Sequence, residues 1–125
     1  MIHGIGTDIV AVARLKGMWE RHGERIADKF LAPCEREGFA RAPDKGRFLA
    51  KRFAAKEAFA KALGTGVRAP ATLTAIGVTH DDLGKPLFAP GEALAALLAD
   101  KGLVAHLSIS DEADYAVAYV ILEKP

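Results

Sequence analysis

The stretch FAAKEAFAKALGTG, residues 53–66, predicts the central helix of the fold and places charges on it in an unusual way. Alanine and leucine favour helix through most of the stretch, and Gly64 with the Thr-Gly pair after it is typical of a helix end. Upstream, Asp44 is suited to cap the first turn of the same helix. Together these signals predict one long helix over residues 45–63.

Two cations of this helix fall where apolar side chains are expected. Counted from Phe48 at about 100° per residue, the apolar residues occupy an arc between roughly 20° and 140° of the helical wheel. Arg52 and Lys56 lie inside that arc. Because a buried, unpaired cation is costly, each must reach out to solvent, pair with a carboxylate, or line a cleft that receives an anion. The helix alone leaves all three alternatives open.

The segments on either side alternate between helical and strand patterns. Before the long helix we expect a strand over residues 2–10, a helix from there to Gly23, and short helices over 24–31 and 33–42. After it we expect strands over 74–80 and 87–88 around a turn, a helix over 91–101, and strands over 106–110 and 115–122 around a hairpin turn. This order predicts an α+β fold whose mostly antiparallel sheet packs against a long central helix.

Composition indicates one domain, spanning residues 1–125, with a real hydrophobic core. Half of the residues are hydrophobic, and no repeat or biased tract interrupts the chain. The apolar start meets Asp8 too early for a signal-peptide core, and no run reaches transmembrane length, so we expect a cytoplasmic protein. Cys34 is the only cysteine, which excludes an internal disulfide, and we expect it to be structural.

Charge is distributed unevenly although the net charge is only +1. Residues 9–70 hold 14 Lys and Arg against 7 Asp and Glu, and the remainder holds 3 against 9. Such a basic half suits an acidic partner or several phosphates, although a dipolar surface without a ligand is equally compatible. A nucleic-acid-binding protein is disfavoured, because aromatic residues make up only 7% and the overall charge is small.

Two carboxylates form the candidate metal site. Asp8 lies at the end of the first predicted strand, and Glu57 lies on the long helix beside its basic residues. Magnesium that binds nucleotide phosphates commonly takes only one or two protein carboxylates, so these two acids would suffice. Lys61 follows Glu57 by one helical turn, a spacing that equally describes an exposed surface pair. Gly64 then begins the glycine-containing segment that completes this candidate phosphate site.

A second candidate surface lies on the helix after the first strand. Arg14 and Arg21 are seven residues apart and so project together, with Met18 between them. A basic pair on either side of an apolar residue is a suitable binding surface for an acidic amphipathic helix. A solvated arginine stripe is the alternative.

Four motifs occur in an order and spacing that resemble one known family nearly end to end. They are GIGTDIV near the start, RFAAKEAFAKALGTG in the long helix, LGKP in the turn, and HLSIS before the last strand. Together they resemble the holo-acyl-carrier-protein synthases, the small 4′-phosphopantetheinyl transferases of fatty-acid synthesis. The resemblance implies transfer of the phosphopantetheine arm of coenzyme A to a serine of apo-acyl carrier protein, with release of 3′,5′-ADP. It also implies a homotrimer with active sites between subunits.

The resemblance also assigns roles to residues of this sequence. Mg²⁺ would be held by Asp8 and Glu57, and either Glu57 or a water on the metal would accept the serine proton. Carrier protein would bind the surface of Arg14, Met18 and Arg21. Contacts to coenzyme A are implied for one set of residues: Arg52, Lys56, Lys61, Gly64, His106 and Ser108.

Two positions within or next to these motifs have roles that the resemblance does not assign. Asp111 closes the HLSIS segment where several relatives have histidine, so this end of the nucleotide pocket departs from the family pattern. Lys85 of LGKP suits either a nucleotide contact or plain turn chemistry. A different function, a non-catalytic module that binds coenzyme A or a nucleotide, would use the same basic groove without needing Asp8 and Glu57 as a pair.

Overall fold

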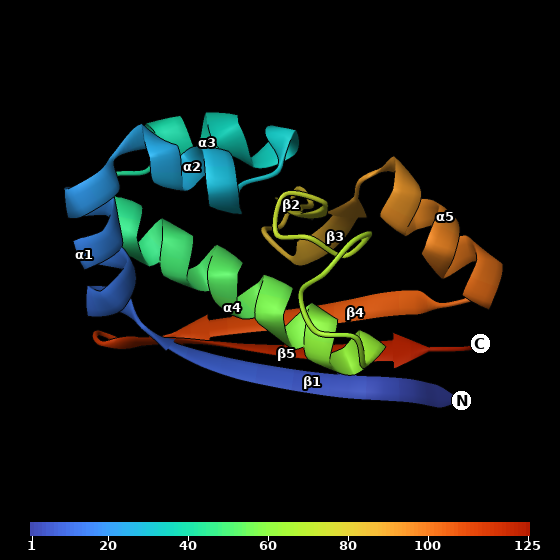
Figure 1. The fold of residues 1–125 in the computed structure, drawn as a ribbon. Coiled ribbons are helices and arrows are strands. Elements are labelled where there is room, and N and C mark those ends of the chain that lie inside the picture. The colour runs from blue at the N-terminus through green and yellow to red at the C-terminus, as the bar shows by residue number, and fades with distance from the viewer.

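A three-stranded antiparallel sheet forms one layer of the protein. The computed structural model describes residues 1–125, and in it β1 (Ile2–Ala11) pairs with β5 (Tyr115–Glu123), which pairs with β4 (Val104–Asp111). Figure 1 shows the strands β1, β5 and β4 side by side beneath the helices. Successive side chains of a strand point to opposite faces of the sheet. The helices cover one face, so one set of side chains faces them and the other set faces the open side.

The long helix α4 (Lys45–Leu63) lies across the covered face of this sheet (Figure 1). Its bounds are those predicted from the sequence. The Asp44 carboxylate accepts a hydrogen bond of 3.0 Å from the backbone N–H of Arg47 and so caps the first turn. Gly64 ends the helix in the left-handed conformation at φ 89°, which a side chain would strain.

The remaining elements lie on the same side of the sheet as α4 (Figure 1). They are α1 (Val12–His22), α2 (Glu24–Phe30), the short 3₁₀ helix η1 (Pro33–Glu35), α3 (Arg36–Arg41), the hairpin of β2 (Ile76–His80) and β3 (Pro86–Pro90), and α5 (Glu92–Lys101). The predicted α+β class and antiparallel pairing are therefore confirmed, but the strands form two separate sheets, because β2 pairs only with β3. None of the helices is both long and apolar enough to cross a membrane.

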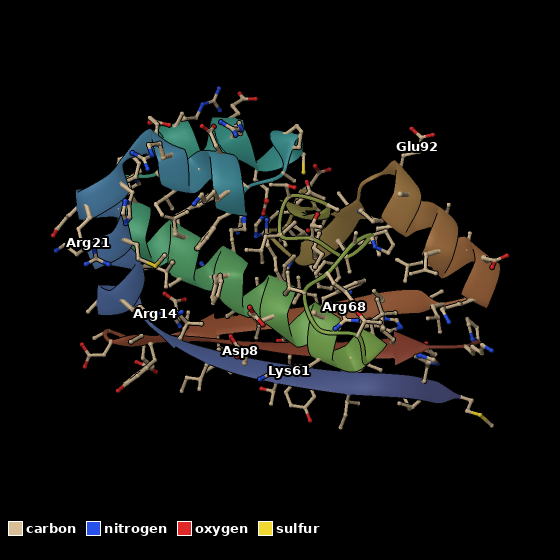
Figure 2. All side chains as sticks on the ribbon, in the orientation of Figure 1. Asp8, Arg14, Arg21, Lys61, Arg68 and Glu92 are labelled. Atoms are coloured by element: carbon tan, nitrogen blue, oxygen red, sulfur yellow. The ribbon has the colours of Figure 1, made fainter.

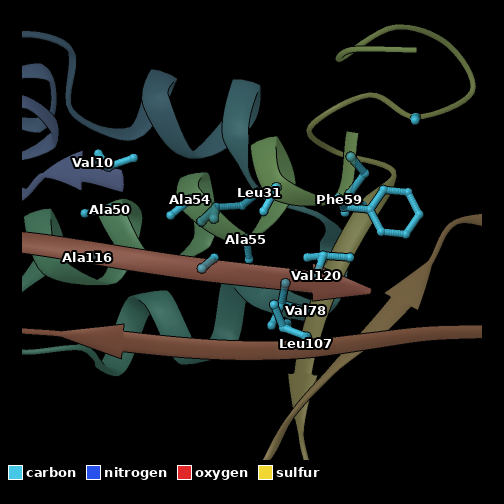
Figure 3. Close-up of a cluster of buried hydrophobic side chains, with 14 of the residues drawn as sticks. Val10, Leu31, Ala50, Ala54, Ala55, Phe59, Val78, Leu107, Ala116 and Val120 are labelled. Carbon is cyan, nitrogen blue, oxygen red and sulfur yellow. The ribbon is translucent and has the colours of Figure 1, made fainter. Parts of the chain in front are cut away.

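Alanines pack α4 closely against the sheet and the surrounding elements. Ala54, Ala55 and Ala58 have no exposed surface, and neither do Ala116 and Ala118 of β5. Figure 3 shows small side chains of α4 and β5 among the larger residues of the core. Alanines around the helix circumference are buried, so the single apolar arc of the helical wheel underestimates the burial of α4. Its burial depends on small residues that allow close backbone approach.

Two glycines bring β1 into backbone contact with α4. A Cβ atom on Gly6 would lie 1.9 Å from the carbonyl oxygen of Ala58, and one on Gly4 would lie 2.0 Å from that of Ala62. Neither position therefore accepts a side chain without moving the strand or the helix. Asp8 follows on the same face of β1, so this close contact sets its carboxylate against α4.

Candidate active site

Asp8 and Glu57 meet where β1 crosses α4. Gly6, two residues before Asp8, packs against the carbonyl of Ala58, the residue that follows Glu57. Partial burial raises the pKa of Glu57, and the negative charge of Asp8 raises it further. The two carboxylates therefore interact although they lie 49 positions apart in the sequence.

Lys61 supplies a cation to this acid pair. Its Nζ lies 3.2 Å from Asp8 Oδ1 and donates a 2.9 Å hydrogen bond to the carbonyl of Thr7. Its positive charge also lowers the pKa of Glu57, against the larger effects of burial and Asp8. In Figure 2, Asp8 lies on β1 with Lys61 on one side and Arg14 on the other.

Arg14 connects the acid pair to the exposed face of α1. Its guanidinium lies 5.4 Å from the ring centroid of Phe53, and its charge also lowers the pKa of Glu57. Arg21 lies further along the same helix (Figure 2), and Met18 between them is half-buried. Both arginines are exposed, so the predicted basic pair forms a surface that begins beside Asp8 and Glu57.

Lys56 has a structural role, which corrects its assignment as a phosphate contact. Its side chain is completely buried and donates to the Glu35 carboxylate, to the Phe30 carbonyl at 2.6 Å and to the Leu73 carbonyl at 2.8 Å. An ammonium has three donors, so none is left for a ligand. Of the three alternatives that the helical wheel left open for Lys56, the structure has internal pairing.

Arg52 shares this buried carboxylate but also borders a pocket. Its Nε lies 3.1 Å from Glu35 Oε2, and its guanidinium stacks 4.2 Å above the ring centroid of Phe48. Burial lowers the pKa of Arg52, and Glu35 opposes that effect. The pocket measures about 270 Å³, and its lining includes the basic side chains Arg47, Lys51, Arg52 and His80. We call it the basic pocket.

Asp111 lies at the edge of the basic pocket. Arg47 donates to Asp111 Oδ2 at 2.9 Å and to the carbonyls of Glu112 and Ala113, so it ties the β4–β5 hairpin to the start of α4. Lys51 lies 3.9 Å from the same carboxylate. Asp111 therefore neutralises part of the charge of this pocket.

A larger groove lies on the other face of the sheet. It measures about 580 Å³, and His106, Ser108, Tyr119 and Lys85 contribute to its lining. The imidazole Nε2 of His106 lies 2.9 Å from Glu123 Oε1. Along β4, the buried side chain of Leu107 faces α4, so His106 and Ser108 point away from it. Within one chain they are thus separated from Asp8 by the sheet.

Comparison with known proteins identifies the family. The model of the 4′-phosphopantetheinyl transferase superfamily matches residues 4–120. The chain belongs to this superfamily. A protein of Dechloromonas aromatica named holo-[acyl-carrier-protein] synthase is 74% identical over 123 residues, which are 98% of each chain. The predicted resemblance and the enzyme class are thereby confirmed.

Solved structures of phosphopantetheinyl transferases share the fold. The holo-[acyl-carrier-protein] synthase of Neisseria meningitidis has a TM-score of 0.95 and 47% identity, over 99% of this chain and 100% of that one. The Bacillus anthracis enzyme, solved in complex with coenzyme A (3′,5′-ADP), has a TM-score of 0.84 and 35% identity, over 100% of this chain and 99% of that one. The α+β fold is therefore that of this transferase family.

The structure also defines the roles of three further residues. Sequence reasoning missed Glu35, because the 21 positions that separate it from Lys56 carry no periodic signal linking them. Gly64 uses its N–H to cap α4, donating to the carbonyls of Ala60 and Lys61, so that group is not free for a phosphate. Cys34 is exposed, and partial burial followed by the charge of Glu35 raises the pKa of its thiol, which disfavours a reactive thiolate.

Proposed function

We propose that this transferase moves the 4′-phosphopantetheine group of coenzyme A to a serine of apo-acyl carrier protein and releases 3′,5′-ADP. The convergence of Asp8, Glu57 and Lys61 at the crossing of β1 and α4 carries this proposal, because it combines two acids with an exposed cation. It is supported by the name of the relative that is 74% identical and by the coenzyme A bound to the Bacillus anthracis relative.

The donor set of the acid pair fits Mg²⁺. Both ligands are carboxylates, and no group of three or more His, Cys, Asp or Glu side chains forms a complete protein cage. Magnesium keeps several waters and binds through one or two carboxylates together with substrate phosphates, as these residues would require. Asp8 and Glu57 would hold the ion, which when bound would neutralise charge on the pyrophosphate.

The transfer itself is a displacement at phosphorus. The serine oxygen of the carrier attacks the β-phosphorus of coenzyme A, the bond to the bridging oxygen breaks, and 3′,5′-ADP leaves with that electron pair. Glu57, or a water held beside it, would accept the serine proton. Lys61 holds a phosphate oxygen and stabilises the leaving group, while Arg52 binds a phosphate from the basic pocket.

Carrier protein docks on α1 in this proposal. Arg14 and Arg21 offer two exposed cations to an acidic helix, and Met18 offers it an apolar contact. Because Arg14 also acts on Glu57, a carrier bound there would present its serine next to the acid pair.

A neighbouring subunit completes the nucleotide site. Since His106 and Ser108 point away from Asp8, the chain that supplies the acid pair must take these two from another copy. The open face of the sheet is also apolar, with Ile9 64% and Tyr119 49% exposed, and such a face favours burial against another protein. We therefore propose a homotrimer with active sites between subunits, working in cytoplasmic fatty-acid synthesis.

One assay tests the function directly. The protein is incubated with coenzyme A, Mg²⁺ and apo-acyl carrier protein, and the intact mass of the carrier is measured. We expect the carrier to gain the mass of one phosphopantetheine group, and Asp8→Ala and Glu57→Gln to lose nearly all of this activity while staying folded. Binding of coenzyme A without any mass gain would instead favour the non-catalytic module.

A further inference from the structure

The ammonium of Lys61 already neutralises the carboxylate at which the proposed metal ion would bind. It lies 3.2 Å from Asp8 Oδ1, and its second contact, to the Thr7 carbonyl, also belongs to β1. The Asp8 side chain is only 17% exposed, so its charge is poorly hydrated and needs a nearby cation. Lys61 is the only Lys or Arg side chain that the structure pairs with Asp8.

Lys61 is free to leave this position. Its side chain is 55% exposed, and both of its acceptors lie on the edge of the site rather than in the core. Lys56, five positions earlier on α4, shows the contrast, because its side chain is completely buried and all three of its donors have acceptors within the protein. Of these two lysines, only Lys61 is exposed enough to exchange one anion for another.

We propose that Lys61 is the counter-cation of Asp8 in the free protein and competes there with a divalent ion. This inference rests on the proposed function. When coenzyme A binds, its pyrophosphate offers Lys61 another anion, and Asp8 becomes available to the metal ion. Binding of the ion and of coenzyme A are therefore positively coupled through Lys61, and this coupling is reciprocal.

The competition has a consequence that can be measured without coenzyme A. A cation that must be displaced from Asp8 lowers the affinity of the free protein for the ion, because like charges repel at this distance. Removing the ammonium should therefore tighten metal binding, although a lysine has been lost from the site. A lysine that served only to bind phosphate would not have this effect.

The test is titration of the protein with Mn²⁺, first alone and then in the presence of coenzyme A, with free Mn²⁺ measured by electron paramagnetic resonance. We expect Lys61→Met to bind Mn²⁺ at least about fivefold more tightly than wild type without coenzyme A, the lower end of usual coupling effects. Lys61→Arg keeps the charge and should bind as weakly as wild type. Lys101→Met, an exposed substitution at the end of α5, should also match wild type.

Coenzyme A should tighten Mn²⁺ binding by a larger factor in wild type than in Lys61→Met, because only the wild type has a competing ammonium to remove. If wild type binds Mn²⁺ and Lys61→Met binds it no more tightly, the competition is refuted. The assignment of Asp8 and Glu57 as metal ligands would then still stand. If neither protein binds Mn²⁺ with or without coenzyme A, both the competition and that assignment fail. Thermal unfolding of Lys61→Met verifies that its fold is intact.

Discussion

Lys56 and Glu35 form an ion pair in which neither side chain has any exposed surface. Glu35 is also the acid nearest to Arg52, at 3.1 Å, so a single carboxylate balances two cations of α4. Its Oε1 accepts a further hydrogen bond of 2.8 Å from the backbone N–H of Ala32. The pair therefore ties the helix that carries Glu57 to the segment between α2 and α3.

Loss of either partner should destabilise the protein strongly. Glu35→Gln leaves the buried cations Lys56 and Arg52 without their carboxylate. Lys56→Met leaves Glu35 with Arg52 as its only cation and removes the donor to two backbone carbonyls. We expect each substitution to lower the free energy of unfolding by about 3–5 kcal/mol. The double variant should lose less than the sum of the two, because only Arg52 is then left without its carboxylate. Urea denaturation measures all three. Arg41→Ala, which breaks the exposed Arg41–Glu37 pair, is the control and should cost less than about 1 kcal/mol.

The contact between β1 and α4 predicts the effect of a single methyl group. In Gly6→Ala the added Cβ would meet the Ala58 carbonyl, so the strand must move away from the helix. We expect a loss of about 3 kcal/mol in the free energy of unfolding, at the upper end for overpacking, and a loss of transfer activity. In Gly91→Ala the nearest atom lies at 3.6 Å, so this control should be nearly neutral. Equal stability of the two variants would contradict the proposed constraint.

Sequence patterns predicted the local structure well because local chemistry determines it. Asp44 and Gly64 cap α4 as expected, and the element order was correct. The assignment of Lys56 to coenzyme A was wrong, because its partner Glu35 is identified only by the tertiary fold. Likewise, sequence alternation places His106 and Leu107 on opposite faces of a strand but does not say which face meets α4.

The raised pKa of Glu57 predicts opposite effects on stability and activity. Burial and Asp8 make the ionised form less favourable in the folded protein than in the unfolded chain. Without a divalent ion, this penalty is absent below the ordinary pKa of 4.5, grows as pH rises towards the folded pKa, and is complete above it. Glu57→Gln should therefore be more stable than wild type at pH 7 and equally stable below about pH 4.

Thermal unfolding of the metal-free proteins across this pH range measures the difference. Transfer by wild type should also fall at acidic pH, since Glu57 must be ionised to hold the ion. A Glu57→Gln variant that is less stable than wild type at pH 7 would show that Glu57 is not strained by its surroundings.

The two arginines of α1 should differ in their effects on catalysis. Arg21→Glu reverses a charge on the docking surface only, so we expect it to raise the KM for carrier protein at least about tenfold and to leave the KM for coenzyme A nearly unchanged. Arg14→Glu should raise the same KM and also shift the pH dependence of transfer upward, because Arg14 lowers the pKa of Glu57. Arg41→Glu on α3 serves as the charge-reversal control. Similar increases in both KM values for Arg21→Glu would exclude α1 as a carrier-specific surface.

Subunit complementation tests the proposed trimer. Asp8 and His106 project from opposite faces of one sheet, so each active site would combine Asp8 of one chain with His106 of a neighbour. Asp8→Ala and His106→Ala should each be impaired alone. After unfolding, mixing in equal amounts and refolding, random assembly of a ring leaves about one site in four with both residues intact. We expect transfer activity to recover to roughly that fraction of refolded wild type. A mixture no more active than the average of its two components would mean that every site is built within one chain, and it would exclude His106 of a neighbour from catalysis.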